Sequence, residues 1–219
     1  VLRTIKYDDK SFIAHLFTAS RGHTTFMVNA SRSKRSGGNA RLFQPLSFLS
    51  FQWDIKPNTT LHRMKEVHLL FTLQDIPYHP VKRSVSMLLA EFMVHTLNNE
   101  AKNTDLYNYI EHSIQWYDAA TDGYANFHLV FLLKLARFLG FAPNTEDYTE
   151  GYCFDLTRGC FTPSEIHADT LLCSTDATLF YHLSITNYGT MNTIAMSRHD
   201  RARLVRYLAA YYELHTPAF

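Results

Sequence analysis

The sequence predicts an α+β protein, with a small β-barrel in its first third and a helical domain after it. Apolar residues alternate with a period of two up to about residue 75 and then recur at helical spacing. The chain has 219 residues, of which 46% are hydrophobic and 19% charged, so it can bury a substantial core. Two prolines flank Tyr78 and His79, so a boundary near Ile76–Pro80 would give domains 1–76 and 80–219.

Five short segments of the first domain have the alternation and the aromatic or β-branched content of strands. Polar breaks separate them, and Lys56–Thr59 is the clearest turn. An OB-type barrel fits this number of strands, and such barrels commonly bind single-stranded nucleic acid. The predicted strands are Val1–Lys6, Phe12–Thr18, Thr24–Val28, Leu46–Trp53 and Leu61–Leu70.

The second domain has the apolar spacing of helices. Gly140 is a plausible C-terminal cap, and Ser197 with Asp200 three residues later resembles a capping box at the start of the last helix. Residues 142–174 contain several glycines and prolines and should be irregular. The other predicted helices are Val81–Asn98, Asp105–Ala119, Ala125–Phe138, which should be central and buried, and one near Asp176–Tyr188.

Three cysteines, Cys153, Cys160 and Cys173, lie in this irregular stretch. Their odd number and spacing favour a reducing compartment, and buried free thiols are the expected state. Together with His167 they suggest a zinc site, but structural zinc usually needs a tight C-x₂₋₄-C pair, which is missing. We therefore expect no metal and no other cofactor. No apolar run approaches the length that a bilayer requires, so no membrane association is expected.

Residues 32–41 form the most distinctive segment, which reads Arg-Ser-Lys-Arg-Ser-Gly-Gly-Asn-Ala-Arg. Four positive charges are uninterrupted by a negative one, and two glycines give the backbone freedom. Residues 1–75 contain 11 Lys and Arg against 5 Asp and Glu, a net charge of +6, whereas the remainder carries −5. A basic front and an acidic back indicate a polyanionic partner for the first domain.

A flexible basic loop on a β-scaffold suits a phosphate backbone, because phosphate contacts supply much of the affinity for nucleic acid. The alternative is a solvated loop that binds nothing. One or two aromatic residues of the barrel should stack on bases, but the sequence does not say which. The expected contacts are Arg32, Lys34, Arg35 and Arg41, with Arg21, Lys6 and Arg3 as further cations.

Enzyme motifs are missing: the sequence contains no HExxH pattern, no GxSxG elbow and no P-loop. The leading hypothesis is a non-enzymatic DNA-binding protein. The second is an RNA-binding OB-fold protein, which contact with a 2′-OH would distinguish. The third is a hydrolase that uses some of the twelve histidines, which turnover of generic ester substrates would reveal.

Four segments, in order, resemble the bacterial RecO recombination mediators. Residues 29–36, Asn-Ala-Ser-Arg-Ser-Lys-Arg-Ser, are similar to the family's "GARSKRS" segment. Phe17-Thr18 with Arg21-Gly22 resembles its "FT…xG" hairpin, and residues 42–45 resemble its "LQP" strand start. Phe127 through Phe141 resembles its "F…LL…LGY" helix.

The resemblance implies an N-terminal OB-fold, a helical C-terminal domain, and binding of single- and double-stranded DNA. It also implies annealing of complementary strands, cooperation with RecR, and loading of RecA onto gaps coated with single-strand-binding protein (SSB). Such a protein would be cytoplasmic and associated with the nucleoid.

The chain departs from the family pattern at two places. Many RecO proteins have paired CxxC motifs that hold zinc, and this sequence has none. The helical domain of the family receives the acidic C-terminal tail of SSB, and a basic residue often precedes the Phe of the central helix. That position is Asn126 here, so Lys134 and Arg137 are the expected cations for the tail. The arginines between 198 and 206 are either an alternative binding patch or salt-bridge partners within the domain.

Overall fold

The computed structural model describes residues 1–29, 40–54, 59–163, 170–173 and 175–216. The chain divides into two compact units, Val1–Ala119 and Ala120–Phe219. The first unit therefore contains the first five strands together with the first two helices. The domain boundary expected near Ile76–Pro80 remains a prediction.

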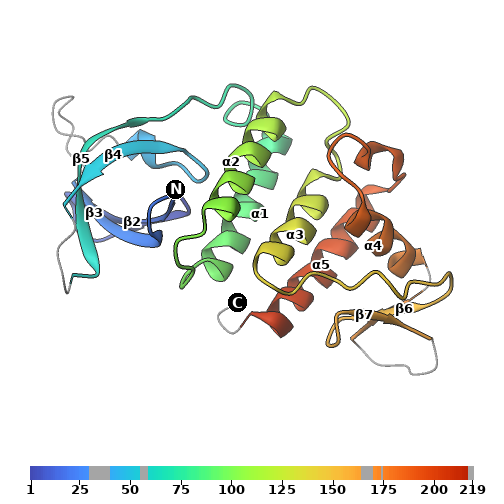
Figure 1. Ribbon diagram of the computed structural model, residues 1–219. Coiled ribbons are helices and arrows are strands. Elements are labelled where there is room, and N and C mark those ends of the chain that lie inside the picture. The colour runs from blue at the N-terminus through green and yellow to red at the C-terminus, as the bar shows by residue number, and fades with distance from the viewer. Residues whose placement is uncertain (30–39, 55–58, 164–169, 174, 217–219) are drawn as a thin grey trace. The chain divides into compact units, whose positions relative to one another are not determined.

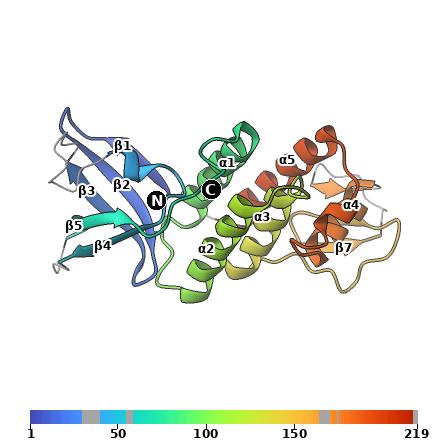
Figure 2. The same ribbon diagram turned by 90° about the horizontal axis from the view of Figure 1, so that it is seen from above.

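Five strands form the sheet of the first unit, in the order β1-β2-β3-β5-β4 (Figures 1 and 2). All neighbours are antiparallel except β3 and β5, which run parallel. This mixed order is the Greek-key arrangement of an OB-like barrel and confirms the predicted fold class. The strands are β1 Arg3–Lys6, β2 Ser11–Thr18, β3 Gly22–Asn29, β4 Leu49–Trp53 and β5 Leu61–Leu69, close to the expected limits.

Alternating residues of β2 and β3 fill the interior of the barrel. Phe12, Ala14 and Leu16 of β2 face Phe26 and Val28 of β3 in one buried cluster. Phe43, from the short 3₁₀ helix η1 (Ala40–Phe43), closes the cluster with its ring centroid 5.2 Å from that of Phe12. The opposite faces of the same strands point outward. The side chains of that outer face are therefore available for contacts.

Helices α1 (Pro80–Thr96) and α2 (Thr104–Ala119) belong to the same unit, and the segment before α1 is tightly held. The carboxylate of Asp118 accepts hydrogen bonds from three consecutive main-chain N–H groups, those of Gln74, Asp75 and Ile76. Lys82, whose side chain is fully buried, donates to the main-chain carbonyl of Asp118 and pairs with Asp75 at 2.7 Å. These contacts fix the connection from β5 to α1.

The turn between β2 and β3 lies against the connection between α1 and α2. The main-chain N–H of His23 donates to the carbonyl of Glu100 at 2.9 Å. Gly22 has a φ of +74°, and a Cβ there would overlap the backbone of Glu100 and Ala101. Only glycine meets both requirements, so Gly22 fixes the end of this hairpin.

In the second unit, helix α3 (Phe127–Phe138) is buried along nearly its whole length, as expected for a central helix, and contacts both α4 (Thr175–Ile185) and α5 (Arg198–His215) (Figure 1). Gly140 has a φ of +87° and ends α3, since its N–H and that of Phe141 donate to Arg137 and Ala136. Ser197 and Asp200 form the predicted capping box of α5.

Residues 142–174 are less irregular than expected. Three short strands form a sheet in the order β7-β6-β8, with bounds Cys153–Asp155 (β6), Cys160–Thr162 (β7) and Leu171–Leu172 (β8). The expectation of free thiols is wrong for two of the cysteines. β6 and β8 pair Phe154 with Leu172, which sets Cys153 opposite Cys173, and a disulfide joins them across Cα atoms 4.2 Å apart. Cys160 is free.

None of the helices among the described residues combines the length and apolar character needed to cross a bilayer.

Candidate nucleic-acid interface

The central part of the basic segment lies outside the described residues, so the structure gives no positions for Arg32, Lys34 and Arg35. Both of its ends are anchored on the barrel. β3 ends at Asn29, and η1 begins at Ala40 and inserts Phe43, 2% exposed, into the core. Arg41 lies exposed on η1. The segment therefore follows β3 and ends on η1.

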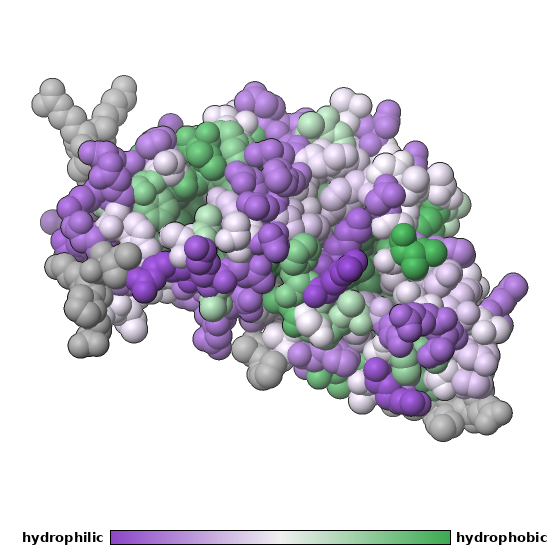
Figure 3. Space-filling model, viewed as in Figure 1, coloured by the Kyte–Doolittle hydropathy of each residue, from purple (hydrophilic) through white to green (hydrophobic). Residues whose placement is uncertain are grey.

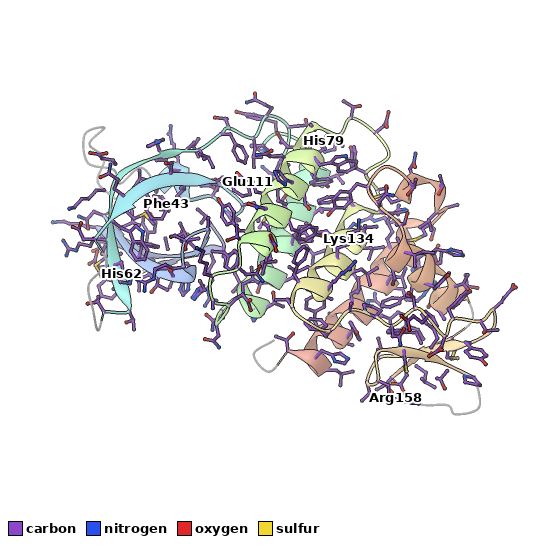
Figure 4. The ribbon with its side chains drawn as sticks, viewed as in Figure 1. Phe43, His62, His79, Glu111, Lys134 and Arg158 are labelled. Atoms are coloured by element: carbon purple, nitrogen blue, oxygen red, sulfur yellow. A yellow bond between two sulfur atoms is a disulfide. The ribbon has the colours of Figure 1, made fainter. Side chains whose placement is uncertain are left out.

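Arg21 lies exposed in the turn between β2 and β3, and its guanidinium carbon is 6.0 Å from the ring centroid of Trp53 on β4. The ring of Trp53 also contacts two other rings of the barrel, with Phe26 at 5.0 Å and His62 at 4.7 Å between ring centroids. Figure 4 labels His62 and Phe43 in this barrel. A cation above a half-buried indole can contact a phosphate and an unstacked base together.

Arg3 and Lys6 lie on β1 with exposed side chains. Lys6 pairs with Asp9 at 3.1 Å, but side-chain exposures of 76% and 95% make this ion pair weak. Arg3 lies directly opposite His15 of β2. Nδ1 of His15 is 3.3 Å from Nε2 of His23 on β3, and their rings stack with centroids 5.5 Å apart. We call Arg3, His15 and His23 the Arg3 row.

Sequence reasoning missed two parts of this face, although alternation within the strands contained the signal. His15 and His23 were set aside among the twelve histidines, yet both alternate with core residues and therefore point outward. Arg63 of β5 is exposed and lies beside Met27 in the parallel pairing of β3 and β5. Hydrophilic side chains cover the left end of the view in Figure 3, where Figure 1 places β3 and β5.

A pocket of about 300 Å³ opens within the first unit. Its wall combines Phe51 and Trp53 of β4 with Phe17 of β2, Met93 of α1 and Tyr107 of α2. Phe17 and Tyr107 stack on each other with centroids 6.4 Å apart. Trp53 therefore joins two features, because it lines this pocket and lies below Arg21.

The cations expected to bind a protein tail lie on α3. The Nζ atom of Lys134 is 5.2 Å from the ring centroid of Tyr188, and partial burial lowers the pKa of this amine (Figure 4). Arg137 is exposed in the last turn of the helix. Asn126 is buried, and its amide donates to the carbonyls of Met191 and Ile194 at 2.9 Å each. Asn126 therefore holds the loop before α5.

Of the arginines of α5, Arg203 forms salt bridges within the helical unit. Its guanidinium binds both carboxylate oxygens of Asp176 at 2.7 and 2.6 Å and Asp200 at 2.9 Å. Ser197 and then Arg203 lower the pKa of Asp200 to about 2 through hydrogen bonds. Arg201 donates to the carbonyl of Met196 at 2.7 Å. Arg203 therefore links α5 to α4, and Arg201 holds the segment just before α5.

The part of the chain that the structure describes contains no group of three or more His, Cys, Asp or Glu side chains arranged to hold a metal ion. Two of the proposed ligands, Cys153 and Cys173, are joined to each other, and His167 lies outside the described residues.

Two family models match the chain: "Recombination protein O N terminal" over residues 1–73 and "Recombination protein O C terminal" over residues 79–218. A curated relative from Phocaeicola vulgatus, named DNA repair protein RecO, is 41% identical over 219 residues, which cover 100% of this chain and 91% of the relative. The relatives of that name from Bacteroides fragilis and Porphyromonas gingivalis are 39% and 30% identical, with the same shares covered.

Proposed function

Because the chain belongs to the RecO family of bacterial DNA repair proteins, we propose that it is a non-enzymatic recombination mediator. It would bind single- and double-stranded DNA, anneal complementary strands, and help load a RecA-type recombinase onto DNA coated with SSB. Its protein partners would be RecR and the C-terminal tail of SSB. It would work in the cytoplasm, at the nucleoid.

The basic segment at residues 32–41, anchored at both ends on an OB-like barrel, is the observation that carries this proposal. Arg21 above Trp53 adds a cation and an aromatic surface on the same barrel. Lysines and arginines in such loops contact phosphates without reading base edges, so binding should show little sequence preference. A mediator that acts at any gap needs this property.

The test is a strand-annealing assay with complementary oligonucleotides coated with SSB. The wild-type protein should accelerate annealing, and the Arg32, Lys34 and Arg35 to Ala triple variant should lose most of that acceleration. A matched triple variant at exposed cations elsewhere, Arg83, Lys102 and Arg158 to Ala, should retain it.

Two results would contradict the proposal. Equal annealing by both triple variants would exclude the basic segment as the main contact. Tighter binding to RNA than to DNA of the same sequence would favour the RNA-binding alternative, since contact with the 2′-OH separates the two.

The acidic tail of SSB would bind the helical region with its carboxylates near Lys134 and Arg137. Lys134 supports this role because it lies on an aromatic surface, the ring of Tyr188, which an apolar side chain of the tail could share. Partial burial also strengthens the attraction of its charge for a carboxylate.

A further inference from the structure

The outer face of β1, β2 and β3 carries a cluster of basic groups that the basic segment does not include. In the Arg3 row, Arg3 and His15 are direct cross-strand neighbours. His23 is the diagonal neighbour of His15, since His15 pairs with Thr25 in the register of β2 and β3. Three nitrogen-bearing side chains from three adjacent strands therefore converge on one small area of the sheet.

Within the described residues, Arg3 forms no ion pair, and each imidazole uses one nitrogen toward the other ring. The second nitrogen of each ring, Nε2 of His15 and Nδ1 of His23, makes no hydrogen bond there. Both rings are only half-buried, so these nitrogens can reach a ligand. One ring donates to the other, so in the neutral pair one of the two outer nitrogens carries a proton and the other a lone pair. The cluster thus offers a guanidinium and one imidazole N–H to an anion, and its second outer nitrogen can take up a proton.

Burial and then the charge of Arg3 lower the pKa of both His15 and His23. The charge of His23 lowers the pKa of His15 further. The α1–α2 connection meets His23 through the main-chain carbonyl of Glu100, and α2 meets the face through Tyr107 on Phe17. Among the described residues, no carboxylate contributes to the pKa shift of either ring. The protein itself therefore holds the pair uncharged at neutral pH.

We propose that the Arg3 row is a phosphate site for the DNA backbone and that it takes up a proton from solvent when the phosphate binds. This inference rests on the proposed binding of DNA and names one of its contacts. An anion above the row reverses the repulsion that Arg3 imposes on the imidazoles, because a neighbouring negative charge favours their protonated forms. A phosphodiester group has two free oxygens, which can accept from the guanidinium and from an imidazole N–H together.

Proton uptake gives the site a measurable signature. The affinity for DNA should rise as the pH falls from the raised pKa of the imidazoles in the complex to their lower pKa in the protein without DNA. Each unit by which bound phosphate raises an imidazole pKa corresponds to about tenfold tighter binding at low pH. A contact made by lysine or arginine alone would show no such dependence over the same range.

The first measurement uses the wild-type protein. NMR titration of the imidazole resonances of His15 and His23 is carried out with and without inorganic phosphate, and again with a short oligothymidylate. We expect the pKa of at least one of the two rings to rise with each ligand, while the resonances of His112, exposed on α2, do not respond to either ligand. Unchanged pKa values for both rings with both ligands would overturn the proposal.

The second measurement compares oligothymidylate affinities at pH 6.0 and pH 7.5. For each protein, the ratio of the affinity at pH 6.0 to the affinity at pH 7.5 is determined. This ratio should be at least about threefold larger for the wild type and for His112→Gln than for the double variant His15→Asn, His23→Asn. The same gain in all three proteins would refute the site while leaving DNA binding intact. Failure to bind DNA at either pH, with a pKa that still responds to inorganic phosphate, would instead refute the proposed function and retain a phosphate site.

Discussion

Arg3 on β1 and Arg203 on α5 are both arginines on regular elements, but their surroundings differ. Arg3 faces two imidazoles and, within the described residues, forms no ion pair, whereas Arg203 is held by the carboxylates of Asp176 and Asp200. A phosphate can approach Arg3 directly, but at Arg203 it would have to displace two existing partners. Both residues count as one positive charge in the sequence. Only the neighbours of each side chain in the structure show that Arg3 is open to a ligand whereas Arg203 links two helices.

The largest effect that would separate the two units is expected from the disulfide, which lies in the second unit, the unit of Arg203. Reduction of Cys153–Cys173 should lower the free energy of unfolding of that unit by about 3 kcal/mol, since the bond closes a loop of 20 residues. Denaturant unfolding with and without reductant, monitored in Cys153→Ser and in the Cys160→Ser control, measures this effect. DNA affinity should not change on reduction if binding belongs to the first unit.

Elemental analysis should find no stoichiometric zinc in the oxidised protein. One zinc per chain that disappears in Cys153→Ser would show that the two sulfurs hold a metal instead of each other.

Removal of the cations of the basic segment should have the next largest effect. The Arg32, Lys34 and Arg35 to Ala variant should bind single-stranded DNA roughly a hundredfold more weakly at 0.1 M salt, because three phosphate contacts are lost. The slope of log K against log salt should fall by about 2 to 2.7. The matched control replaces three exposed cations of the second unit, Arg158, Arg198 and Arg206, by Ala, and an equal loss there would contradict the division between the two regions.

Charge reversal on α3 tests whether the helical unit binds an acidic peptide. The double variant Lys134→Glu, Arg137→Glu should bind a labelled SSB tail peptide about tenfold more weakly or worse, since hydrogen bonds to charged groups contribute about 1.5–3 kcal/mol. Fluorescence anisotropy measures the affinity, and Arg158→Glu in the β6–β7 turn serves as the control (Figure 4). Unchanged binding would place the tail elsewhere, with the arginines of α5 as the next candidate.

The smallest expected effect is the loss of stability at low pH that results from protonation of Asp200, the ion-pair partner of Arg203. The pKa of Asp200 is lowered from 3.8 to about 2 in the folded protein, so its contribution to stability is complete above pH 4 and is lost as the pH falls toward 2. The melting temperature of Asp200→Asn should therefore fall less steeply than that of the wild type over this range. Asp147→Asn, at an exposed carboxylate, should follow the wild type.

The parts of the fold that depend on local pattern could be predicted from the sequence. Alternation placed the five strands within a few residues, and the Ser197 capping box and the Gly140 cap marked helix ends, because each depends on neighbours along the chain. The pairing of Cys153 with Cys173 could not be predicted, since it depends on the register of β6 against β8. The contact of His15 with His23 likewise required the register of the β2–β3 hairpin.

The candidate DNA contacts also divide into those that the local sequence predicts and those that depend on the pairing of strands. Composition alone identified the basic segment, but its residues Arg32, Lys34 and Arg35 remain predictions because they lie outside the described residues. Alternation in the sequence indicates that His15 and His23 point outward, but it does not show which side chains meet across strands, and both the cation above Trp53 and the Arg3 row depend on such contacts.

The hydrogen bonds from the N–H groups of residues 74–76 to the Asp118 carboxylate should affect how the protein resists proteolysis. A protease must draw a stretch of substrate backbone out into its active-site cleft, and this connection looks vulnerable because it is neither helix nor strand. Three of its N–H groups are bound to one carboxylate, and Lys82 beneath it holds Asp75. The link between the barrel and its helices should therefore escape cleavage until α2 itself unfolds.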